Sequence, residues 1–130
     1  MKKVEQKMKE EEAKNYINPE LGVEAKERGN ALFREGKFPD AIKEFDEAIR
    51  RDPTNASYFS NRSFAYIKLM EPVRGKEDAE KAIELDPNFV KAYIRKATCH
   101  QLMKEYHKAM ETYENGMKLD PDNQEMKAGY

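Results

Sequence analysis

GVEAKERGNALFREGKFPDAIKEFDEAIRRDPTN, residues 22–55, is the first copy of a pattern that recurs along the chain. An Asp-Pro pair stands near its end, and the pair returns at a spacing of 34 residues: Asp52-Pro53, Asp86-Pro87 and Asp120-Pro121. Laid out at this period, the chain divides into three blocks: 22–55, 56–89 and 90–123. A fixed period of this length indicates an array of structural repeats.

Each block is predicted to form two helices. In the first block, apolar residues such as Ala41 and Phe45 recur with the spacing of one helical face. Gly36 separates the two helices, and Pro39 suits the first turn of the second. Each Asp-Pro pair ends the second helix, because the residue before proline is disfavoured in the α region. Asn18, followed by proline, is predicted to cap the helix that opens the array.

Small and large residues alternate between matching positions of the blocks. The small ones include Gly29, Ser63 and Ala97, and Ala41, Gly75 and Ala109. The large ones are Phe45, Phe59, Tyr93 and Tyr113. Small residues let two helices approach closely while large ones fill the space between pairs. One helix pair cannot bury its apolar face alone, so the three blocks are expected to share a core. The sequence therefore predicts an all-α fold.

Composition excludes several classes of function. The chain has 24 Lys and Arg against 25 Asp and Glu, a net charge of −1, which argues against a general nucleic-acid binder. No apolar run is long enough to span a membrane. The single cysteine, Cys99, cannot form an internal disulfide, and this fits a reducing compartment such as the cytoplasm.

No chemistry-bearing motif is present, so the chain is predicted to be neither an enzyme nor a metal or cofactor binder. A glycine-rich phosphate loop, a GxSxG elbow and an HExxH pair are all missing from the sequence. His100 and His107 are expected at the surface, with no cluster around them to complete a metal site. Cys99 falls in a column of small residues and is expected to be a buried, inert thiol. Met70, Met103, Met110 and Met117 are expected to pack in the core.

One face of the first helices gathers polar and basic side chains. Lys26 and Asn30 are four residues apart, as are Lys91 and Arg95, so each pair shares a helical face. Two cations at this spacing repel by about 0.2–0.5 kcal/mol in an isolated helix. That repulsion is relieved if an anion binds between them. The predicted ligand is an extended peptide that bears a carboxylate, although a solvated basic face would explain any one of these residues.

The repeat pattern resembles the tetratricopeptide repeat. The residues of the first block that carry the resemblance are Gly29, Leu32, Ala41, Phe45, Ala48 and Pro53. The resemblance implies a right-handed superhelical array of three helix-turn-helix repeats within a domain at 18–123. Residues 124–130 are similar to the start of the capping helix of such arrays, cut short. Ala25, Gly75 and His100 depart from the usual pattern, which puts local stability in doubt.

The polar face resembles the carboxylate clamp of co-chaperone tetratricopeptide domains. The matching segments are AKERGNALF, YFSNRSFAY and VKAYIRKATC, and the five clamp residues are Lys26, Asn30, Asn61, Lys91 and Arg95. The resemblance implies binding of the C-terminal Glu-Glu-Val-Asp sequence of heat-shock chaperones, with the seventy-kilodalton class favoured over the ninety-kilodalton class. Secondary groove residues would be Phe33, Phe64, Lys68, Asn88 and Thr98. Structural scaffolding is the alternative, through an internal partner segment or self-association, with no need for a free C-terminus.

The segment before the repeats is predicted to be a charged linker, residues 1–17. Nine of the thirteen residues from Lys2 to Lys14 are charged, with mixed signs. This composition fits either a solvated helix or frayed tail, or a helical spacer to a preceding domain. Tyr16-Ile-Asn-Pro19, and PNFVKAYIRKA at residues 87–97, are also similar to the last repeat domain of the Hsp-organising co-chaperones, which supports the spacer.

Overall fold

The computed structural model describes the backbone of residues 2–129 and the side chains of residues 5–12 and 14–129. Within this range the chain forms eight helices and no strand: α1 (Lys2–Tyr16), α2 (Pro19–Arg34), α3 (Phe38–Arg51), α4 (Ala56–Lys68), α5 (Pro72–Leu85), α6 (Val90–Leu102), α7 (Tyr106–Leu119) and α8 (Gln124–Gly129). The predicted all-α fold is confirmed.

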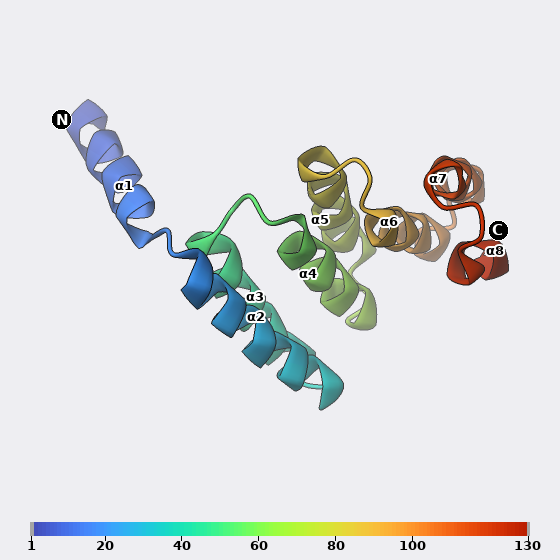
Figure 1. The fold of residues 1–130 in the computed structure, drawn as a ribbon, viewed down its shortest axis with the longest axis horizontal. Coiled ribbons are helices and arrows are strands. Elements are labelled where there is room, and N and C mark those ends of the chain that lie inside the picture. The colour runs from blue at the N-terminus through green and yellow to red at the C-terminus, as the bar shows by residue number, and fades with distance from the viewer. Residues whose placement is uncertain (1, 130) are drawn as a thin grey trace.

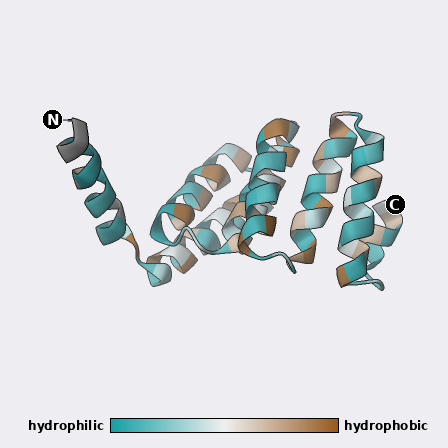
Figure 2. Ribbon diagram, turned by 90° about the horizontal axis from the view of Figure 1, so that it is seen from above, coloured by the Kyte–Doolittle hydropathy of each residue, from teal (hydrophilic) through white to brown (hydrophobic). Residues whose placement is uncertain are grey.

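The helices after α1 form an array of pairs. α2 packs on α3, α4 on α5 and α6 on α7, and successive pairs stack through α3 with α4 and α5 with α6. Figure 1 shows α1 projecting from one end of this array and α8 lying at the other end. In Figure 2 the pairs follow one another across the view, with hydrophobic residues interspersed along every pair. Clusters of buried residues accordingly occur in every repeat, around Phe45, around Phe59 and around Tyr113.

The helix ends follow the predicted stop and start signals. The Asn18 side chain accepts a hydrogen bond from the backbone N–H of Leu21 at 3.2 Å, which caps α2. Prolines occupy the first turns of α2, α3 and α5. α3, α5 and α7 end immediately before an aspartate of an Asp-Pro pair. The Asp-Pro signal thus fixes the end of the outer helix in every repeat.

The turn inside each repeat uses a left-handed residue at the same position of the period. Gly36 has φ 78°, Met70 has φ 58° and Lys104 has φ 62°. Glycine adopts this conformation freely, whereas a side chain makes it unfavourable by about 1 kcal/mol. The core position predicted for Met70 is wrong, because its place in this turn leaves it 68% exposed. Met110 is likewise exposed on α7, whereas Met103 and Met117 are partly buried.

Close helix approach within a pair depends on the predicted small residues. A Cβ atom on Gly29 would lie 2.5 Å from Cε1 of Phe45, so no side chain fits where α2 crosses α3. In the second repeat, buried Ser63 donates a hydrogen bond from Oγ to the carbonyl oxygen of Gly75 at 2.7 Å. This bond links α4 to the first turn of α5. Small residues therefore stand at both crossings, as predicted, and at the first of them the large residue Phe45 fills the adjoining space.

A ladder of ion pairs also joins helices within and between the repeats. Its cations stand at the same position of each block: Arg28, Arg62 and Lys96. Arg62 on α4 makes a bidentate contact with Asp78 on α5, with nitrogen–oxygen distances of 2.8 and 2.7 Å. Its third hydrogen bond reaches Asp46 on α3 at 2.8 Å. One guanidinium therefore ties three helices of two adjacent repeats together.

The burial of Cys99 was predicted correctly from the sequence, whereas that of its neighbour His100 was not. Cys99 is fully buried, as predicted, and this burial raises the pKa of its thiol to about 12. The surface position predicted for His100 is wrong, because its side chain is only 6% exposed. His100 stands where the other repeats place Leu32 and Tyr66, and its Nδ1 lies 3.1 Å from Oε1 of Glu105. The contact spans the α6–α7 turn and satisfies a polar ring at an otherwise apolar position.

α1 is held to the array through its last residue. Tyr16 donates a hydrogen bond from its hydroxyl to Oε1 of Glu47 at 2.6 Å, and this bond lowers the pKa of the Glu47 carboxyl. The Arg51 guanidinium lies 3.5 Å from the centroid of the Tyr16 ring and donates to the Tyr16 carbonyl oxygen at 3.0 Å. These contacts fix where α1 leaves the repeats, while the described side chains of residues 5–15 are exposed.

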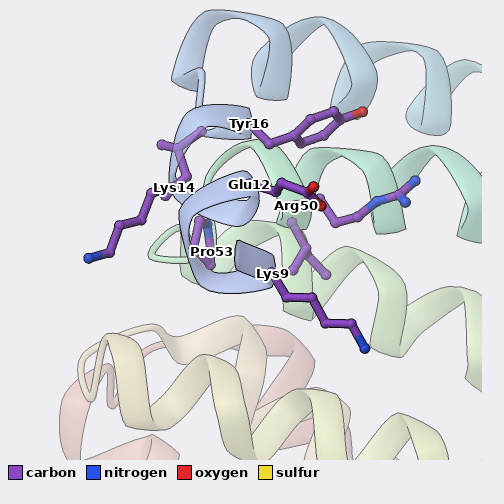
Figure 3. A pocket seen from close by; sticks show the side chains of 8 residues that line it. Lys9, Glu12, Lys14, Tyr16, Arg50 and Pro53 are labelled. Atoms are coloured by element: carbon purple, nitrogen blue, oxygen red, sulfur yellow. The ribbon is translucent and has the colours of Figure 1, made fainter. Parts of the chain in front are cut away.

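A cleft of about 960 Å³ lies between α1 and the end of α3. Figure 3 shows its labelled side chains coming from α1, from α3 and from the loop that follows α3. The lining residues are Lys9, Glu12, Lys14, Tyr16, Ile17, Ile49, Arg50 and Pro53. None of the predicted clamp residues lines this cleft.

Candidate peptide-binding site

The predicted clamp residues all lie on the first helices of the three repeats. Lys26 and Asn30 lie on α2, Asn61 on α4, and Lys91 and Arg95 on α6. α4 contacts both α2 and α6, so it forms the centre of this face. The repeat fold explains the arrangement, because equivalent helices of successive repeats lie side by side.

Asn30 and Asn61 join across the α2–α4 boundary. The Asn61 amide donates a hydrogen bond from Nδ2 to Oδ1 of Asn30, with 3.4 Å between the two atoms. Both side chains are half-buried. The bond orients the two amides relative to each other and leaves N–H donors on both for a ligand.

Arg95 is the most distinctive of the five residues. Its side chain is 15% exposed, and its guanidinium carbon lies 3.8 Å from the centroid of the Phe64 ring. Among the described residues, its buried Nε has no hydrogen-bond partner. Its closest acid is Glu125 on α8, with 3.6 Å between Nη1 and Oε1. Burial lowers the pKa of Arg95 below its usual value, although the guanidinium keeps its charge at neutral pH.

An aromatic wall stands beside Arg95. The ring centroids of Phe33 and Phe64 are 4.9 Å apart, and those of Phe33 and Phe38 are 5.1 Å apart. Lys68 places its Nζ 5.1 Å from the centroid of Phe64. Three predicted secondary residues, Phe33, Phe64 and Lys68, therefore come together around the ring that supports Arg95. Rings in this arrangement offer an apolar surface next to a cation.

The remaining predicted residues are not joined to this group by any hydrogen bond or ion pair among the described side chains. Lys26 is half-buried and Lys91 is exposed, and neither pairs with a described carboxylate. Thr98 donates its hydroxyl to the carbonyl oxygen of Ile94 at 2.8 Å, within its own helix. Asn88 lies exposed in the loop before α6.

Two residues at this site were not predicted from the sequence. Phe38 extends the aromatic wall from the start of α3, and an aromatic residue just after the Gly36 turn could have signalled it. Glu125 approaches Arg95 from α8. No repeat-based signal could have found Glu125, because α8 follows the third block and has no equivalent in the others.

Neither metal chemistry nor a membrane segment emerges from the described part of the chain. It contains no group of three His, Cys, Asp or Glu side chains placed to hold a metal ion. None of the helices within it combines the length and the apolar character needed to cross a membrane.

Comparison with known proteins places the fold in a family. Residues 29–69 match the family described as TPR repeat, and residues 90–123 match the one described as tetratricopeptide repeat. The TPR2B domain of yeast Sti1, solved in a pHsp70 complex, is 39% identical over 85% of this chain and 93% of that chain, with a TM-score of 0.82. The chain belongs to the tetratricopeptide-repeat family. The implied superhelical array is thereby confirmed.

Two further relatives match almost the whole length of the tetratricopeptide chain. The TPR2AB domain of yeast Sti1, solved in a pHSP90 complex, is 40% identical over 98% of this chain and 49% of that chain, with a TM-score of 0.91. The Hsp70-Hsp90 organizing protein of Triticum aestivum is 48% identical over 99% of this chain. This chain spans only 22% of the length of that relative. The similarity to the Hsp-organising co-chaperones inferred from the sequence is confirmed.

Proposed function

We propose that this chain is an adaptor domain that binds the C-terminal Glu-Glu-Val-Asp tail of heat-shock chaperones and acts by binding, not by catalysis. The relatives support this role, since one is an Hsp70-Hsp90 organizing protein and another is a domain solved in a pHsp70 complex. The inert Cys99 thiol, with its pKa near 12, fits a domain without a nucleophile. A reducing cytoplasm is the proposed setting, where this free thiol is stable.

The single observation that carries the proposal is the environment of Arg95, which is largely buried and has a donor without a described partner. A buried donor without a partner destabilises a protein by about 1–3 kcal/mol, more when the group is charged. Arg95 is buried against Phe64, and its Nε is unpaired among the described residues. An arriving carboxylate or carbonyl oxygen would remove this penalty and form a charge-assisted hydrogen bond. The folded domain is thus prepared for an anionic ligand at this point.

The other clamp residues are assigned complementary roles in the proposed complex. Lys26, Asn30, Asn61 and Lys91 would hold the two carboxylates of the terminal aspartate, with ammonium and amide donors. The unpaired state of both lysines among the described side chains supports their availability. Arg95 would bind a carbonyl or carboxylate further upstream.

The secondary residues would contact the rest of the tail. Phe33 and Phe64 would contact the valine, which suits their stacked rings at 4.9 Å. Lys68, Asn88 and Thr98 would contact residues upstream of it. We favour the seventy-kilodalton class of chaperone as partner, because this chain covers 93% of the TPR2B domain solved in a pHsp70 complex and 49% of the TPR2AB chain solved in a pHSP90 complex.

The proposed organisation assigns the binding function to residues 18–123, with a helical connection at 1–17 and a capping segment at 124–130. The Tyr16 contacts with Glu47 and Arg51 support a connection of fixed direction. Met1 and Tyr130 lie outside the described residues.

A peptide titration tests the function. A Glu-Glu-Val-Asp peptide with a free C-terminus should bind at micromolar strength, about −8 kcal/mol, as measured by calorimetry or fluorescence anisotropy. Its C-terminal amide should bind at least about tenfold more weakly, because one clamp carboxylate is lost. Equal binding of the two peptides contradicts the clamp and favours a scaffold that binds internal segments.

A matched pair of lysine variants localises the binding. Lys91→Ala removes a proposed clamp cation, whereas Lys43→Ala removes an exposed cation from α3, outside the groove helices. We expect about a tenfold loss of affinity for the first and less than a twofold change for the second. Both variants should keep the helical circular dichroism of the parent. Similar losses in both would show that only the overall charge matters.

A further inference from the structure

α8 is capped by a residue just before it and docks on the end of the repeat array through Met126. Asn123 accepts a hydrogen bond from the backbone N–H of Met126 at 3.0 Å, which caps the helix. The Met126 side chain is fully buried in a cluster with Ile94, Ala97 and Tyr113. Because Ile94 and Ala97 belong to α6, this burial fixes the rotation of α8 against the helix that carries Arg95.

Glu125 precedes the buried methionine and therefore lies about 100° around α8, where it meets Arg95. Its Oε1 is 3.6 Å from Nη1 of Arg95, and its side chain is 61% exposed while that of Arg95 is 15% exposed. This distance is too long for a direct hydrogen bond, so the attraction is electrostatic and the carboxylate can leave at small cost. Glu125 is the one described acid that forms an ion pair with a predicted clamp residue.

We propose that Glu125 is an internal competitor for the Arg95 subsite. In the empty groove its carboxylate neutralises the guanidinium, and an acidic group of the incoming peptide must displace it before pairing with Arg95. The acidic peptide exchanges one carboxylate for another, so Glu125 reduces the affinity that Arg95 confers. A peptide that is neutral at this subsite cannot replace the Arg95–Glu125 ion pair with one of its own and therefore leaves Glu125 in place. This inference rests on the proposed function of the groove and adds a residue that sets its affinity for acidic tails.

The test compares Glu125→Gln with Asp122→Asn. Each variant removes one negative charge near the start of α8, but Asp122 is 97% exposed at its side chain and forms its ion pair with Lys127, not Arg95. Both proteins are titrated with the free-acid Glu-Glu-Val-Asp peptide. We expect Glu125→Gln to tighten binding about two- to fivefold, the range of an exposed ion pair. Asp122→Asn should change affinity less than half as much in free-energy terms.

Two single-substitution peptides, each with one Glu replaced by Gln, identify the subsite. The gain from Glu125→Gln should vanish for the peptide that has lost the acid facing Arg95, and persist for the other. Unchanged or weaker binding by Glu125→Gln overturns the proposal, as does an equal gain in Asp122→Asn. These outcomes are separate from failure of the clamp itself, which appears as equal binding of acid and amide peptides by the parent protein.

The Arg95 Nε–H resonance in a nitrogen-15 NMR spectrum provides a readout without peptide. Glu125→Gln should shift this signal in the free protein, and Asp122→Asn should leave it in place. The Met126 methyl signal shows whether α8 remains docked in both variants. A docked α8 with an unshifted Arg95 signal in Glu125→Gln contradicts the proposed contact.

Discussion

Arg62 and Arg95 lie on the first helices of adjacent repeats and are both largely buried, yet their surroundings are opposite. The Arg62 side chain is 21% exposed and forms three hydrogen bonds with Asp78 and Asp46. The Arg95 side chain is 15% exposed, stacks on Phe64 and, among the described side chains, forms an ion pair with Glu125 alone, at 3.6 Å. Residue type and burial are matched, so the difference lies in the available partners.

The comparison separates structural from functional charge in a repeat array. Folding has provided Arg62 with acceptors that join three helices, and its binding capacity is used within the chain. Arg95 is desolvated without an equivalent set of acceptors, a state that makes sense when a ligand supplies them. Charge at one helix position thus holds the repeats together, and charge at the neighbouring position is available for binding.

Arg62→Met is expected to have the largest effect, a loss of about 3 kcal/mol in the free energy of unfolding. The substitution keeps most of the side-chain volume but leaves Asp78, 8% exposed at its side chain, as a buried carboxylate without its main partner. Urea unfolding followed by circular dichroism measures the loss. The double variant Arg62→Met/Asp78→Asn should recover part of it, and a stable single variant would show that the ladder is dispensable.

Arg95→Met tests the other arginine with the same substitution. We expect affinity for the acidic peptide to fall about 30-fold, or about 2 kcal/mol, because a charge-assisted contact is lost. The free energy of unfolding should stay within about 0.5 kcal/mol of the parent or rise, since an apolar chain replaces a largely buried cation whose ion pair with Glu125 is long and whose Nε has no described hydrogen-bond partner. If Arg95→Met unfolds as easily as Arg62→Met, the distinction between the two arginines fails.

Gly75→Ala tests whether close packing, as well as charge, stabilises α5, the helix that Arg62 contacts through Asp78. A Cβ atom at this position would lie 2.9 Å from Sγ of Cys99 and 3.3 Å from the carbonyl oxygen of Ser63. We expect a loss of about 1–3 kcal/mol in the free energy of unfolding from this overpacking. Adding Cys99→Ala removes the sulfur contact and should restore part of the loss, as a double-mutant cycle in urea would measure.

The period of the sequence predicted the frame of the molecule well. The Asp-Pro pairs placed the ends of the outer helices, and the alternation of Gly29 with Phe45 predicted a close crossing that the structure contains. The repeat pattern makes Gly75 a departure that puts local stability in doubt, whereas its missing side chain accommodates Cys99. A column of aligned residues reports the average environment of a position and not its neighbours in one particular repeat.

The site was predicted less completely, for a physical reason. Helical spacing placed Lys91 and Arg95 on one face, but it could not show that Arg95 is buried on Phe64 while Lys91 is exposed. Glu125 lies outside the repeats, so its direction depends on how Met126 packs, which is a tertiary property. The surface position predicted for His100 was wrong for a similar reason, because the turn between α6 and α7 brings its partner Glu105 close to the buried ring.

Lys104→Gly should raise the free energy of unfolding slightly without changing the peptide-binding face. We expect this to be the smallest effect of the series. Lys104 adopts φ 62° in the α6–α7 turn, where the first repeat has Gly36 at φ 78°. Glycine relieves the left-handed strain but also gains entropy in the unfolded chain, so we expect a net stabilisation of at most about 1 kcal/mol. Lys104 is exposed, so little packing is lost. Met70→Gly, at φ 58°, should act in the same direction in the preceding turn. Peptide affinity should remain unchanged in both variants. A changed affinity would mean that strain in these turns is transmitted to the clamp residues on α4 and α6, and that the repeat array and its binding face are not independent.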